Sequence, residues 1–327
     1  MKIKIIQQKI NKKQKPIINI FARDIDKGLS LKNKALSSKY FYDDKGSKIF
    51  QKITQHPDYY LTRKEIEILN KIKSKLPKLF KLDEIDIIEL GPGDGSKSKI
   101  IIDGFIKYGC FVNYYPIDIS LKALKLLNKN FKNNNNLNIN GIVSEYFEGL
   151  KFVKKLSKNK QLILFLGSNI GNFEREQSIK FMKNIYNNIK NKSYILTGFD
   201  LKKDPKKLNK AYNDSSKFTE KFNLNLLSRI NKQLKGDFNL NNFIHYGTYN
   251  PLLGAMESFL ISTKRQTVYI ELLNKKYSFE CNEPIHLEYS FKFSLKDIEY
   301  VAYKTGFKIE YNFLSKDNGF INSLWEK

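Results

Sequence analysis

Residues 85–95 of the chain read IDIIELGPGDG. The apolar run at 85–88 is typical of a buried strand, and Glu89 and three alternating glycines follow it. Glycine lets the backbone approach a ligand closely and adopt positive φ without a steric penalty. A helix predicted to begin near Lys97 would point its unpaired N–H groups at the same place. This order of strand, glycine loop and helix predicts a site for an adenosyl cofactor.

The spacing of the glycines restricts which cofactor fits. Gly91, Gly93 and Gly95 alternate, and Ser96 stands where a dinucleotide fingerprint has its third glycine. Ser96 also separates Gly95 from Lys97, which breaks the P-loop pattern. S-adenosylmethionine (SAM) has no pyrophosphate to cradle, but it has a carboxylate and a ribose to hold, so it fits best. A glycine-rich turn that binds no ligand is the alternative.

Two later segments end in residues suited to the same cofactor. Residues 112–119 read as a strand with Asp118 near its end, where a carboxylate can accept hydrogen bonds from ribose hydroxyls. Asp118 could instead be a turn or cap residue for a helix that begins near Ser120. Glu145 and Tyr146 place an acid beside an aromatic ring where a third strand would end. Such a pair could contact an adenine by hydrogen bonding and stacking.

The order of predicted elements points to an α/β fold. Strands and helices alternate between residues 85 and 199, which predicts a parallel sheet with ligands at the carboxyl ends of its strands. Thr62 and Glu65 have the spacing of a capping box that would open a helix just before this region. Residues 202–282 depart from the alternation, with a predicted long helical stretch at 204–233 and strand-like pieces after it. We therefore expect a second lobe inserted into the first.

The composition favours a small-molecule enzyme over a nucleic-acid binder. The formal net charge is +25, but only five of the 58 basic residues are arginine. Arginine is the side chain favoured for bidentate contacts to bases and phosphates. The lysines are scattered along the chain, which is typical of a solvated surface. We expect no nucleic-acid partner, and an RNA-binding or RNA-modifying protein is a distant alternative.

The sequence also limits the compartment and the metal content that we expect. No stretch approaches the roughly 18–20 apolar residues that span a bilayer, and residues 1–22 lack a signal-peptide core. Two cysteines are too few for a disulfide scaffold, and no metal-ligand spacing joins them to the three histidines. We predict a cytoplasmic protein with no bound metal and no membrane partner.

A second loop has residues suited to methylation of an amine. Residues 167–173, GSNIGNF, follow an apolar strand at 162–166. Methylation needs a neutral nitrogen whose lone pair is aligned with the bond to the methyl group. The side-chain carbonyl of Asn172 could accept an N–H and fix that direction without adding charge. A loop or cap role is the alternative for Asn172.

With these motifs together, the chain resembles the histidine-specific Nα-methyltransferases, SAM-dependent enzymes that form trimethylhistidine (hercynine) for ergothioneine synthesis. The similarity extends from about Lys39 to the C-terminus. Its segments are 40–50, 57–63, 89–97, 165–173, 200–205, 211–214, 219–223, 266–268 and 288–293. Many ordered segments at collinear spacing make chance similarity improbable.

The resemblance implies a Rossmann-like SAM-dependent methyltransferase domain with a mixed, mostly parallel sheet, and a second α+β lobe that binds the substrate. In this organisation, residues 1–61 contribute to the substrate lobe and 62–201 form the SAM-binding domain. Residues 202–286 are the substrate lobe proper, and 287–327 return to the methyltransferase domain. The implied reaction is methylation of the α-amino group of L-histidine, up to the trimethylated product.

The site residues follow from the motifs and the resemblance together. The candidate cofactor residues are Glu89, Gly91, Gly93, Gly95, Lys97, Asp118, Glu145 and Tyr146. The candidate residues for the amino acid are Tyr42, Phe50, Tyr59, Asn172, Tyr212, Thr219, Ser258, Glu288 and Ser290. Lys97, at the start of a helix, suits the methionine carboxylate of SAM by its charge.

Within this set, the resemblance implies that Asn172 and Tyr212 hold the α-amino and carboxylate groups. Glu288 and Ser290 alternate along a strand-like segment, so both side chains point to one face and could grip an imidazole N–H. The solvated face of an edge strand is the alternative. Tyr42 is the candidate proton acceptor or water-orienting group. Asn172 and Tyr42 are thus the candidate catalytic residues.

Two positions depart from the family pattern. Ser258 stands where the family has a methionine, and Glu145 stands where an aspartate is usual. Because Ser258 would enlarge or polarise the wall beside the substrate side chain, another amino acid or small amine is the alternative substrate. The mechanism we expect is direct in-line methyl transfer to a neutral amine, and we expect a monomer.

Overall fold

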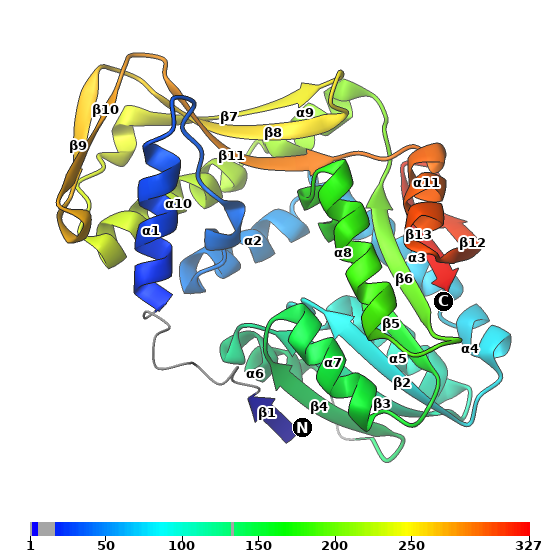
Figure 1. Ribbon diagram of the computed structural model, residues 1–327. Helices are drawn as coiled ribbons and strands as arrows, with labels where there is room; N and C mark the ends of the chain where they lie inside the picture. The colour runs from blue at the N-terminus through cyan, green and yellow to red at the C-terminus, as the bar shows by residue number, and fades with distance from the viewer. Residues whose placement is uncertain (1, 6–16, 132–133) are drawn as a thin grey trace. The chain divides into compact units, whose positions relative to one another are not determined.

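The structure is a computed structural model that describes residues 2–5, 17–131 and 134–327 (Figure 1). The chain divides into two compact units, and each is built from segments far apart in sequence. The first unit comprises Met1–Lys9, Leu61–Lys202 and Lys292–Lys327. The second comprises Ile10–Tyr60 and Lys203–Phe291.

The described strands of the first unit form one sheet in the order β1-β4-β3-β2-β5-β6-β13-β12. Their bounds are β1 Lys2–Ile5, β2 Glu84–Leu90, β3 Phe111–Asp118, β4 Leu137–Val143, β5 Gln161–Phe165, β6 Tyr194–Asp200, β12 Lys308–Leu314 and β13 Phe320–Glu326. The pairs from β1 to β6 are parallel, and β13 is antiparallel to both β6 and β12. The mixed, mostly parallel sheet is thus confirmed.

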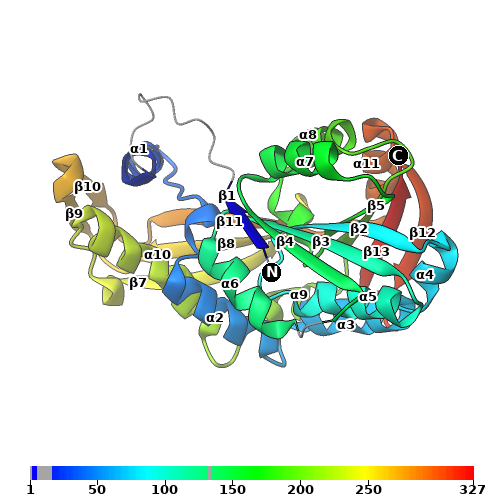
Figure 2. The ribbon, with the colours of Figure 1, turned by 90° about the horizontal axis from the view of Figure 1, so that it is seen from below.

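Helices cover both faces of this sheet. Figure 2 shows α7, α8 and α11 on one face and α3, α5 and α6 on the other. The bounds are α3 Tyr60–Ile72, α4 Lys75–Phe80, α5 Ser96–Lys107, α6 Leu121–Asn130, α7 Tyr146–Leu156, α8 Arg175–Asn188 and α11 Leu295–Thr305, with a 3-10 turn η2 at Asn169–Asn172. The central strands β2 and β5 are buried almost throughout, as expected for strands covered on both faces.

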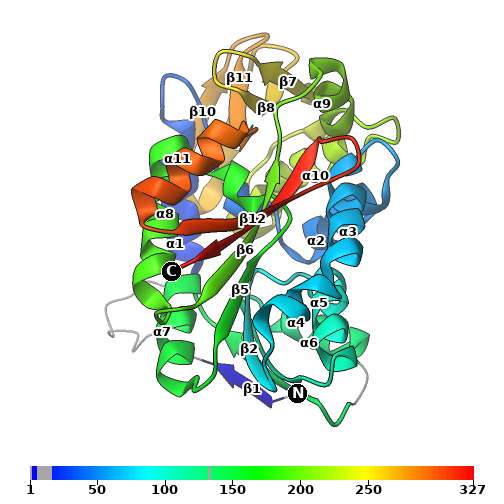
Figure 3. The same cartoon turned by 90° about the vertical axis from the view of Figure 1, so that its right-hand side faces the viewer.

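The strand order places the functional loops. From β2 the chain moves outward through β3 and β4, and then crosses to β5 and β6 on the other side of β2. The loops after β2 and β5 therefore leave the sheet in opposite directions from neighbouring strands. In open α/β sheets this switch point forms the ligand crevice at the carboxyl ends of the strands. The hairpin β12–β13 extends the sheet beyond β6 (Figure 3).

The capping box predicted at Thr62 and Glu65 is wrong. Helix α3 begins at Tyr60, two residues before Thr62, and the Glu65 side chain is fully buried instead of turning back to the helix start. A capping box is present at α11, where the Ser294 and Asp297 side chains each accept the other's backbone N–H. Glu65 has distant partners, which are described below.

The second unit is an α+β structure of its own. A three-stranded antiparallel sheet has the order β11-β8-β7, and β9 and β10 form a separate two-stranded sheet. The bounds are β7 Phe243–Asn250, β8 Ala255–Ser262, β9 Gln266–Ile270, β10 Lys275–Phe279, β11 Pro284–Phe291, α1 Ile17–Leu29, α2 Asp44–Gln55, α9 Pro205–Tyr212, α10 Phe218–Leu234, and the 3-10 turns η1 Ser38–Tyr40, η3 Leu240–Asn242 and η4 Glu271–Leu273. Side chains from α1, α10 and the strands share one hydrophobic core.

The long helical stretch predicted at 204–233 is two helices, α9 and α10. The chain breaks between them because Lys217 adopts positive φ and the Asp214 carboxylate accepts the N–H groups of Phe218 and Thr219 at the start of α10. These bonds satisfy N–H groups that have no partner within a helix. The interruption places Tyr212 at the end of one helix and Thr219 in the first turn of the next.

The tail returns to the first unit later than the sequence predicted. We expected the return at residue 287, but β11 remains paired with β8 as far as Phe291, with a bulge between His286 and Glu288. The first unit resumes at Lys292, whose buried ammonium lies 3.1 Å from the Asp200 carboxylate. Strand pairing thus keeps Glu288 and Ser290 in the second unit.

No helix in the described ranges 2–5, 17–131 and 134–327 is both long and apolar enough to span a bilayer.

Candidate functional site

The glycine loop after β2 has the backbone that the sequence predicted. Gly91, Gly93 and Gly95 all adopt positive φ, at 67°, 58° and 73°. The Gly91 N–H donates to the Ile117 carbonyl at 3.0 Å, which ties the loop to the end of β3. A methyl group built on Gly93 would meet no atom within 4 Å, so open space lies beside this backbone. The loop therefore offers a ligand the space that side chains would otherwise occupy.

Glu89 is a buried carboxyl group at the end of β2, directly before this loop. It is 3% exposed and accepts a hydrogen bond from the Tyr114 hydroxyl. Burial raises the pKa of Glu89 to about 7, against the lowering effects of Tyr114, Ser98 and the charge of Lys97. A carboxyl group with this pKa can accept hydrogen bonds as an anion or donate one as an acid at neutral pH.

Asp118 ends β3 and has a local bond. Its Oδ1 accepts the Ser120 N–H at 2.8 Å, and burial raises the pKa of its carboxyl group. Ser120, not Asp118, caps α6, because Ser120 Oγ accepts the Ala123 N–H. The turn reading of Asp118 is therefore confirmed and the cap reading is wrong, while its ribose contact remains a prediction.

Glu145 and Tyr146 lie at the start of α7. Glu145 is exposed at the N-cap position, and Tyr146 is the first residue of the helix. A Cβ atom on Gly91 would lie 2.6 Å from the Tyr146 hydroxyl oxygen, so this ring borders the glycine loop. Burial raises the pKa of Tyr146 well above its usual range, so the hydroxyl stays protonated and can donate a hydrogen bond. The structure thus brings Tyr146 beside Gly91 within one unit.

Lys97 lies in the first turn of α5 and is paired with an acid. Its Nζ is 2.7 Å from Oε2 of Glu65, a residue that is 0% exposed. Lys97 was predicted to bind a ligand carboxylate by its charge, and its pairing with Glu65 was not predicted. An ammonium group has three N–H donors, so the pairing with Glu65 still leaves Lys97 donors for a second acceptor.

The loop after β5 begins with two residues of positive φ, Gly167 at 83° and Ser168 at 57°. Ser168 is a non-glycine residue in this conformation, and its Oγ accepts the Asp200 N–H at 2.9 Å. The 3-10 turn that follows ends at Asn172, which is exposed. A methyl group on Gly167 would lie 3.2 Å from Lys97 Nζ, so this loop borders the start of α5.

In the second unit, several of the predicted substrate residues form an aromatic cluster. Ring centroids of Tyr42 and Phe50 are 5.3 Å apart, those of Phe50 and Tyr59 6.4 Å, and those of Tyr59 and Tyr212 6.5 Å. Phe222 of α10 contacts both Tyr42 and Phe50, at 5.4 Å and 5.6 Å. Phe222 is not among the predicted site residues, although it lies one turn after Thr219 on the same helix.

Three other predicted substrate residues, Ser258, Glu288 and Ser290, lie on one face of the three-stranded sheet. Ser258 in β8 is directly opposite Glu288 in β11, and Met256 is opposite Ser290. Directly paired residues share a face, and alternate residues along a strand do as well. The shared face predicted for Glu288 and Ser290 is therefore confirmed. Met256, 1% exposed, lies one pair along from Ser258 on the same face.

Tyr212 joins this face to α9. Its hydroxyl donates to Ser290 Oγ at 2.7 Å, and both residues are buried. Its backbone carbonyl accepts a hydrogen bond from His245 Nε2 at 2.9 Å. Since a carbonyl oxygen only accepts, His245 carries its proton on Nε2, and Nδ1 accepts from the Asn223 amide at 2.9 Å. Burial lowers the pKa of His245, which favours this neutral form.

Two asparagines extend the attachment of α9 to β7. The Asn213 side chain donates to the Gly247 carbonyl at 3.0 Å and accepts the Gly247 N–H at 3.2 Å. Asn209 Oδ1 accepts the Tyr249 N–H at 2.9 Å. The end of α9, and with it Tyr212, is therefore fixed to the strand by side-chain hydrogen bonds.

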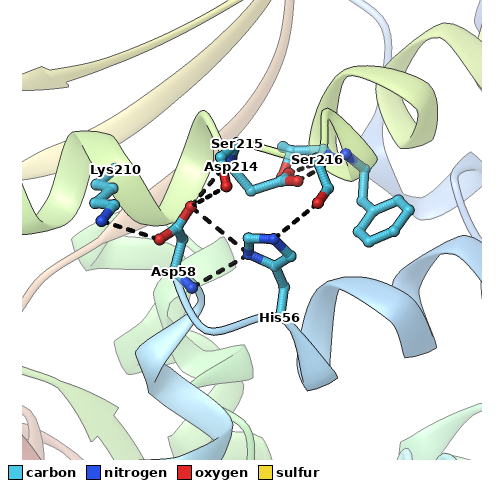
Figure 4. Close-up of polar contacts among 8 residues, drawn as sticks. His56, Asp58, Lys210, Asp214, Ser215 and Ser216 are labelled. Atoms are coloured by element: carbon cyan, nitrogen blue, oxygen red, sulfur yellow. Dashed lines mark hydrogen bonds and ion pairs between the residues drawn. The ribbon is translucent and has the colours of Figure 1, made fainter.

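A polar network also holds the segment between α9 and α10 (Figure 4). The Asp58 carboxylate accepts the Ser215 N–H and hydroxyl, both at 3.0 Å, and lies 3.1 Å from Lys210 Nζ. Hydrogen bonding to Ser215 lowers the pKa of Asp58 to about 2. His56 contacts Ser216 Oγ at 3.0 Å. Tyr59 follows Asp58 directly, so the network fixes the turn that carries it.

The structure thus gathers the predicted cofactor residues and Asn172 in the first unit. The second unit gathers the other predicted substrate residues. Sequence reasoning missed Glu65, Asp58, His245 and Phe222. Glu65, Asp58 and Phe222 lie inside or beside segments of the family resemblance, but their contacts with distant residues become visible only in the fold.

The residues present suit SAM. The open space beside Gly93, the border with Tyr146, and the carboxyl groups of Glu89 and Asp118 supply room, an aromatic ring and hydrogen-bond acceptors around one loop. In the described ranges, no group of three or more His, Cys, Asp or Glu side chains could hold a metal ion.

Comparisons with known proteins identify the family of the chain. The family model for SAM-dependent histidine-specific methyltransferases matches residues 21–327. The chain is 30% identical to a histidine N-alpha-methyltransferase of Mycobacterium tuberculosis, over 83% of this chain and 84% of that protein. It is 28% identical to ergothioneine biosynthesis protein 1 of Schizosaccharomyces pombe, over 86% of this chain and 37% of that protein.

Among solved structures, the CcbJ methyltransferase of Streptomyces caelestis matches with a TM-score of 0.41 and 12% identity, over 79% of this chain and 95% of that one. The fold assignment rests instead on the strand order and on the family match, which covers most of the chain. The chain is an enzyme that belongs to the family of SAM-dependent histidine-specific methyltransferases.

Proposed function

We propose that this enzyme methylates the α-amino group of L-histidine, up to trimethylhistidine, as a step of ergothioneine synthesis. The observation that carries the proposal is the family match over residues 21–327. The named relatives, a histidine N-alpha-methyltransferase and an ergothioneine biosynthesis protein, support it. A second support is the pairing of Glu288 with Ser258, and of Ser290 with Met256, on one sheet face of the second unit.

The proposed division of labour follows the two units. The first unit binds SAM through the glycine loop, with Asp118 on the ribose and Glu145 and Tyr146 at the adenine. The second unit binds the amino acid. There, Tyr212 holds the carboxylate, and Glu288 and Ser290 take the imidazole N–H. Tyr42, Phe50, Tyr59 and Thr219 enclose the rest of the amino acid.

SAM supplies an electrophilic methyl group on a sulfonium sulfur. The protein's share is to hold the amine neutral and correctly directed. A chain-terminal α-amine has a reference pKa of about 8 and the amine of a free amino acid is more basic still, so most of it is protonated at neutral pH. In our proposal the Asn172 carbonyl accepts an N–H of the primary or monomethylated amine and directs the lone pair. Tyr42 accepts the proton that the ammonium group loses before each transfer, or orients a water that does. Tyr42 is 45% exposed, so a proton can pass from it to solvent.

The test is to incubate the purified protein with SAM and an equimolar pool of amino acids and to measure the masses of the amino acids by mass spectrometry. Histidine alone should gain about 14, 28 or 42 mass units after one, two or three transfers, because each transfer replaces a hydrogen with a methyl group. Omission of SAM is the control. Modification of another amino acid, with histidine unchanged, would overturn the proposed substrate but leave the chemistry.

Another amino acid or small amine is the second candidate substrate, and Ser258 is the observation that favours it. Ser258 is 3% exposed and lies between Gly247 and Glu288 on the same sheet face. A serine there leaves more room and adds a hydroxyl beside the substrate side chain. Ser258→Met should sharpen preference for histidine in the same pool if histidine is the substrate. If the second candidate is right, the wild type favours another amino acid, and Ser258→Met lowers the turnover of that amino acid because the larger side chain fills the space that it uses.

We also propose that the enzyme acts as a cytoplasmic monomer without a nucleic-acid partner. Sedimentation velocity tests the oligomeric state, and an RNA mobility shift at physiological ionic strength tests the nucleic-acid alternative. Binding that persists at that salt concentration would revive the distant RNA reading, because nonspecific phosphate contacts weaken steeply with salt.

A further inference from the structure

Glu65 of α3 is a charged side chain with no exposure to solvent. Its Oε2 accepts Lys97 Nζ at 2.7 Å, and its two oxygens lie 3.0 Å and 2.9 Å from the Gly167 N–H. Oε1 also accepts the Asn322 amide at 3.1 Å. A buried carboxylate is stable only when its oxygens are paired in this way. The three partners come from α5, from the loop after β5 and from β13.

Two glycines make room for this arrangement. A methyl group on Gly198 of β6 would lie 2.2 Å from Glu65 Oε1, so the carboxylate fits only because position 198 has no side chain. A methyl group on Gly167 would lie 3.2 Å from Lys97 Nζ. The carboxylate, the ammonium group and the two glycine backbones therefore form one packed cluster at the carboxyl ends of the central strands.

The cluster connects two candidate loops that the sequence treats separately. Lys97 follows the glycine loop that leaves β2, and Gly167 opens the loop that ends at Asn172. A bond from one rigid carboxylate to both fixes the distance between them. It also places the Lys97 ammonium, which keeps donors for a ligand, since only one of its three N–H groups is needed for Glu65.

We propose that Glu65 is a positioning residue that fixes the positions of both the SAM-binding loop and the amine-binding loop of the first unit. It directs the Lys97 ammonium toward the carboxylate of SAM and anchors the start of the loop that carries Asn172. The inference rests on the proposed function for the roles of Lys97 and Asn172.

The test is Glu65→Gln, which keeps the shape of the side chain but removes its charge and turns an N–H₂ group toward a donor. Loss of a charge-assisted hydrogen bond should weaken SAM binding about tenfold, and kcat should fall about tenfold because the second loop loses its anchor. Titration calorimetry measures the SAM affinity without any amino-acid substrate. Its result therefore stands even if histidine proves not to be the substrate.

Glu67→Gln is the matched control. Glu67 lies two residues along the same helix, accepts the Lys316 N–H at 2.7 Å and lies 3.6 Å from Lys64 Nζ. Neither of these partners lies in a candidate loop, so the variant should keep SAM affinity and kcat within about twofold. An equal loss in both variants would mean that Glu65 acts only on the general stability of α3, and would overturn the proposal.

The double variant Glu65→Gln, Lys97→Met separates positioning from a structural role. If Glu65 acts on SAM through Lys97, the double variant binds SAM no more weakly than Lys97→Met alone. Additive losses would contradict the proposal. If Glu65→Gln yields no folded protein, Glu65→Asp decides, because it keeps the charge but shortens the reach. Its SAM affinity should fall about threefold with little change in Tm, and wild-type affinity and kcat would overturn the proposal.

Discussion

The two units hold their candidate residues by different means. In the first unit, positive φ at the three glycines and the ends of parallel strands give the cofactor loop its shape, and the Glu65 carboxylate connects this region to the loop after β5. In the second, side chains hold side chains, as in the bond from Tyr212 to Ser290 and the aromatic contacts of Phe222. A backbone-shaped site should be damaged by an added methyl group, whereas a side-chain-shaped site should be damaged by a removed hydroxyl or amide.

Asn172→Ala tests the one predicted substrate side chain in the backbone-shaped unit. Removing the carbonyl that directs the amine should lower kcat about 100-fold, since small misplacements of a reacting group cost that much. SAM affinity by calorimetry should not change. Asn70→Ala, at an exposed site on α3 of the same unit, is the control. Wild-type turnover of Asn172→Ala would remove Asn172 from the site.

Glu89→Gln tests the charge that the first unit buries. The pKa of Glu89 is raised to about 7 by burial, from a reference value of 4.5. Between these two values the folded protein keeps a proton that the unfolded chain has lost, so the stability of the wild type falls as the pH rises from about 4.5 to 7. Glutamine cannot ionise and still accepts a hydrogen bond from the Tyr114 hydroxyl.

The SAM-free variant should therefore exceed the wild type in free energy of unfolding at pH 8, by on the order of 2 kcal/mol, with a smaller difference at pH 5. Urea unfolding at the two pH values measures this. The variant should also bind SAM more weakly, which would show that stability is given up for binding at this position. A pH-independent difference between the two proteins would contradict the raised pKa.

Tyr212→Phe tests the side-chain-shaped unit. Loss of the hydroxyl that donates to Ser290 should raise the KM for the amino acid about tenfold and leave SAM affinity unchanged. Tyr269→Phe is the matched control, because the Tyr269 hydroxyl donates to Asn274 at 3.0 Å in the separate two-stranded sheet region. If Tyr212→Phe changed SAM affinity and not the KM of the amino acid, the contrast between the units would fail.

Gly93→Ala and Gly95→Ala should separate ligand space from protein packing. Both positions have positive φ, which costs an alanine about 1 kcal/mol. A methyl group at 93 enters open space, so SAM affinity should fall severalfold with little further loss of stability. At 95 it would lie 2.9 Å from atoms of Leu127 and Phe131, which adds roughly 1 kcal/mol of destabilisation. Equal unfolding free energies for the two variants would contradict this reading.

The sequence predicted those parts of the fold that local patterns determine. Apolar runs located β2, β3 and β5. The glycine spacing predicted the loop after β2 because glycine limits the backbone directly. In each case the residues that carry the signal are also the residues that form the element.

The remaining features depend on contacts between distant residues. Glu65 has the spacing of a capping box, but a glutamate side chain is long enough to bond elsewhere, and its partner Gly167 lies 102 positions away. Asp58 bonds to Ser215 across 157 positions. Local spacing cannot distinguish such partners from local ones. The chain returns to the first unit at Lys292 and not at residue 287 for the same reason, because pairing with β8 keeps β11 in the second unit as far as Phe291.

The attachment of α9 to β7 has a consequence for the solubility of the protein. β7 is the last strand of its sheet, and an edge strand with unpaired N–H and C=O groups can recruit a strand from another chain. Here the amide side chains of Asn209 and Asn213 occupy the backbone groups of Gly247 and Tyr249 that would face such a strand. The hydrogen bonds that fix Tyr212 thus also keep a strand of another chain from pairing with β7 at these positions.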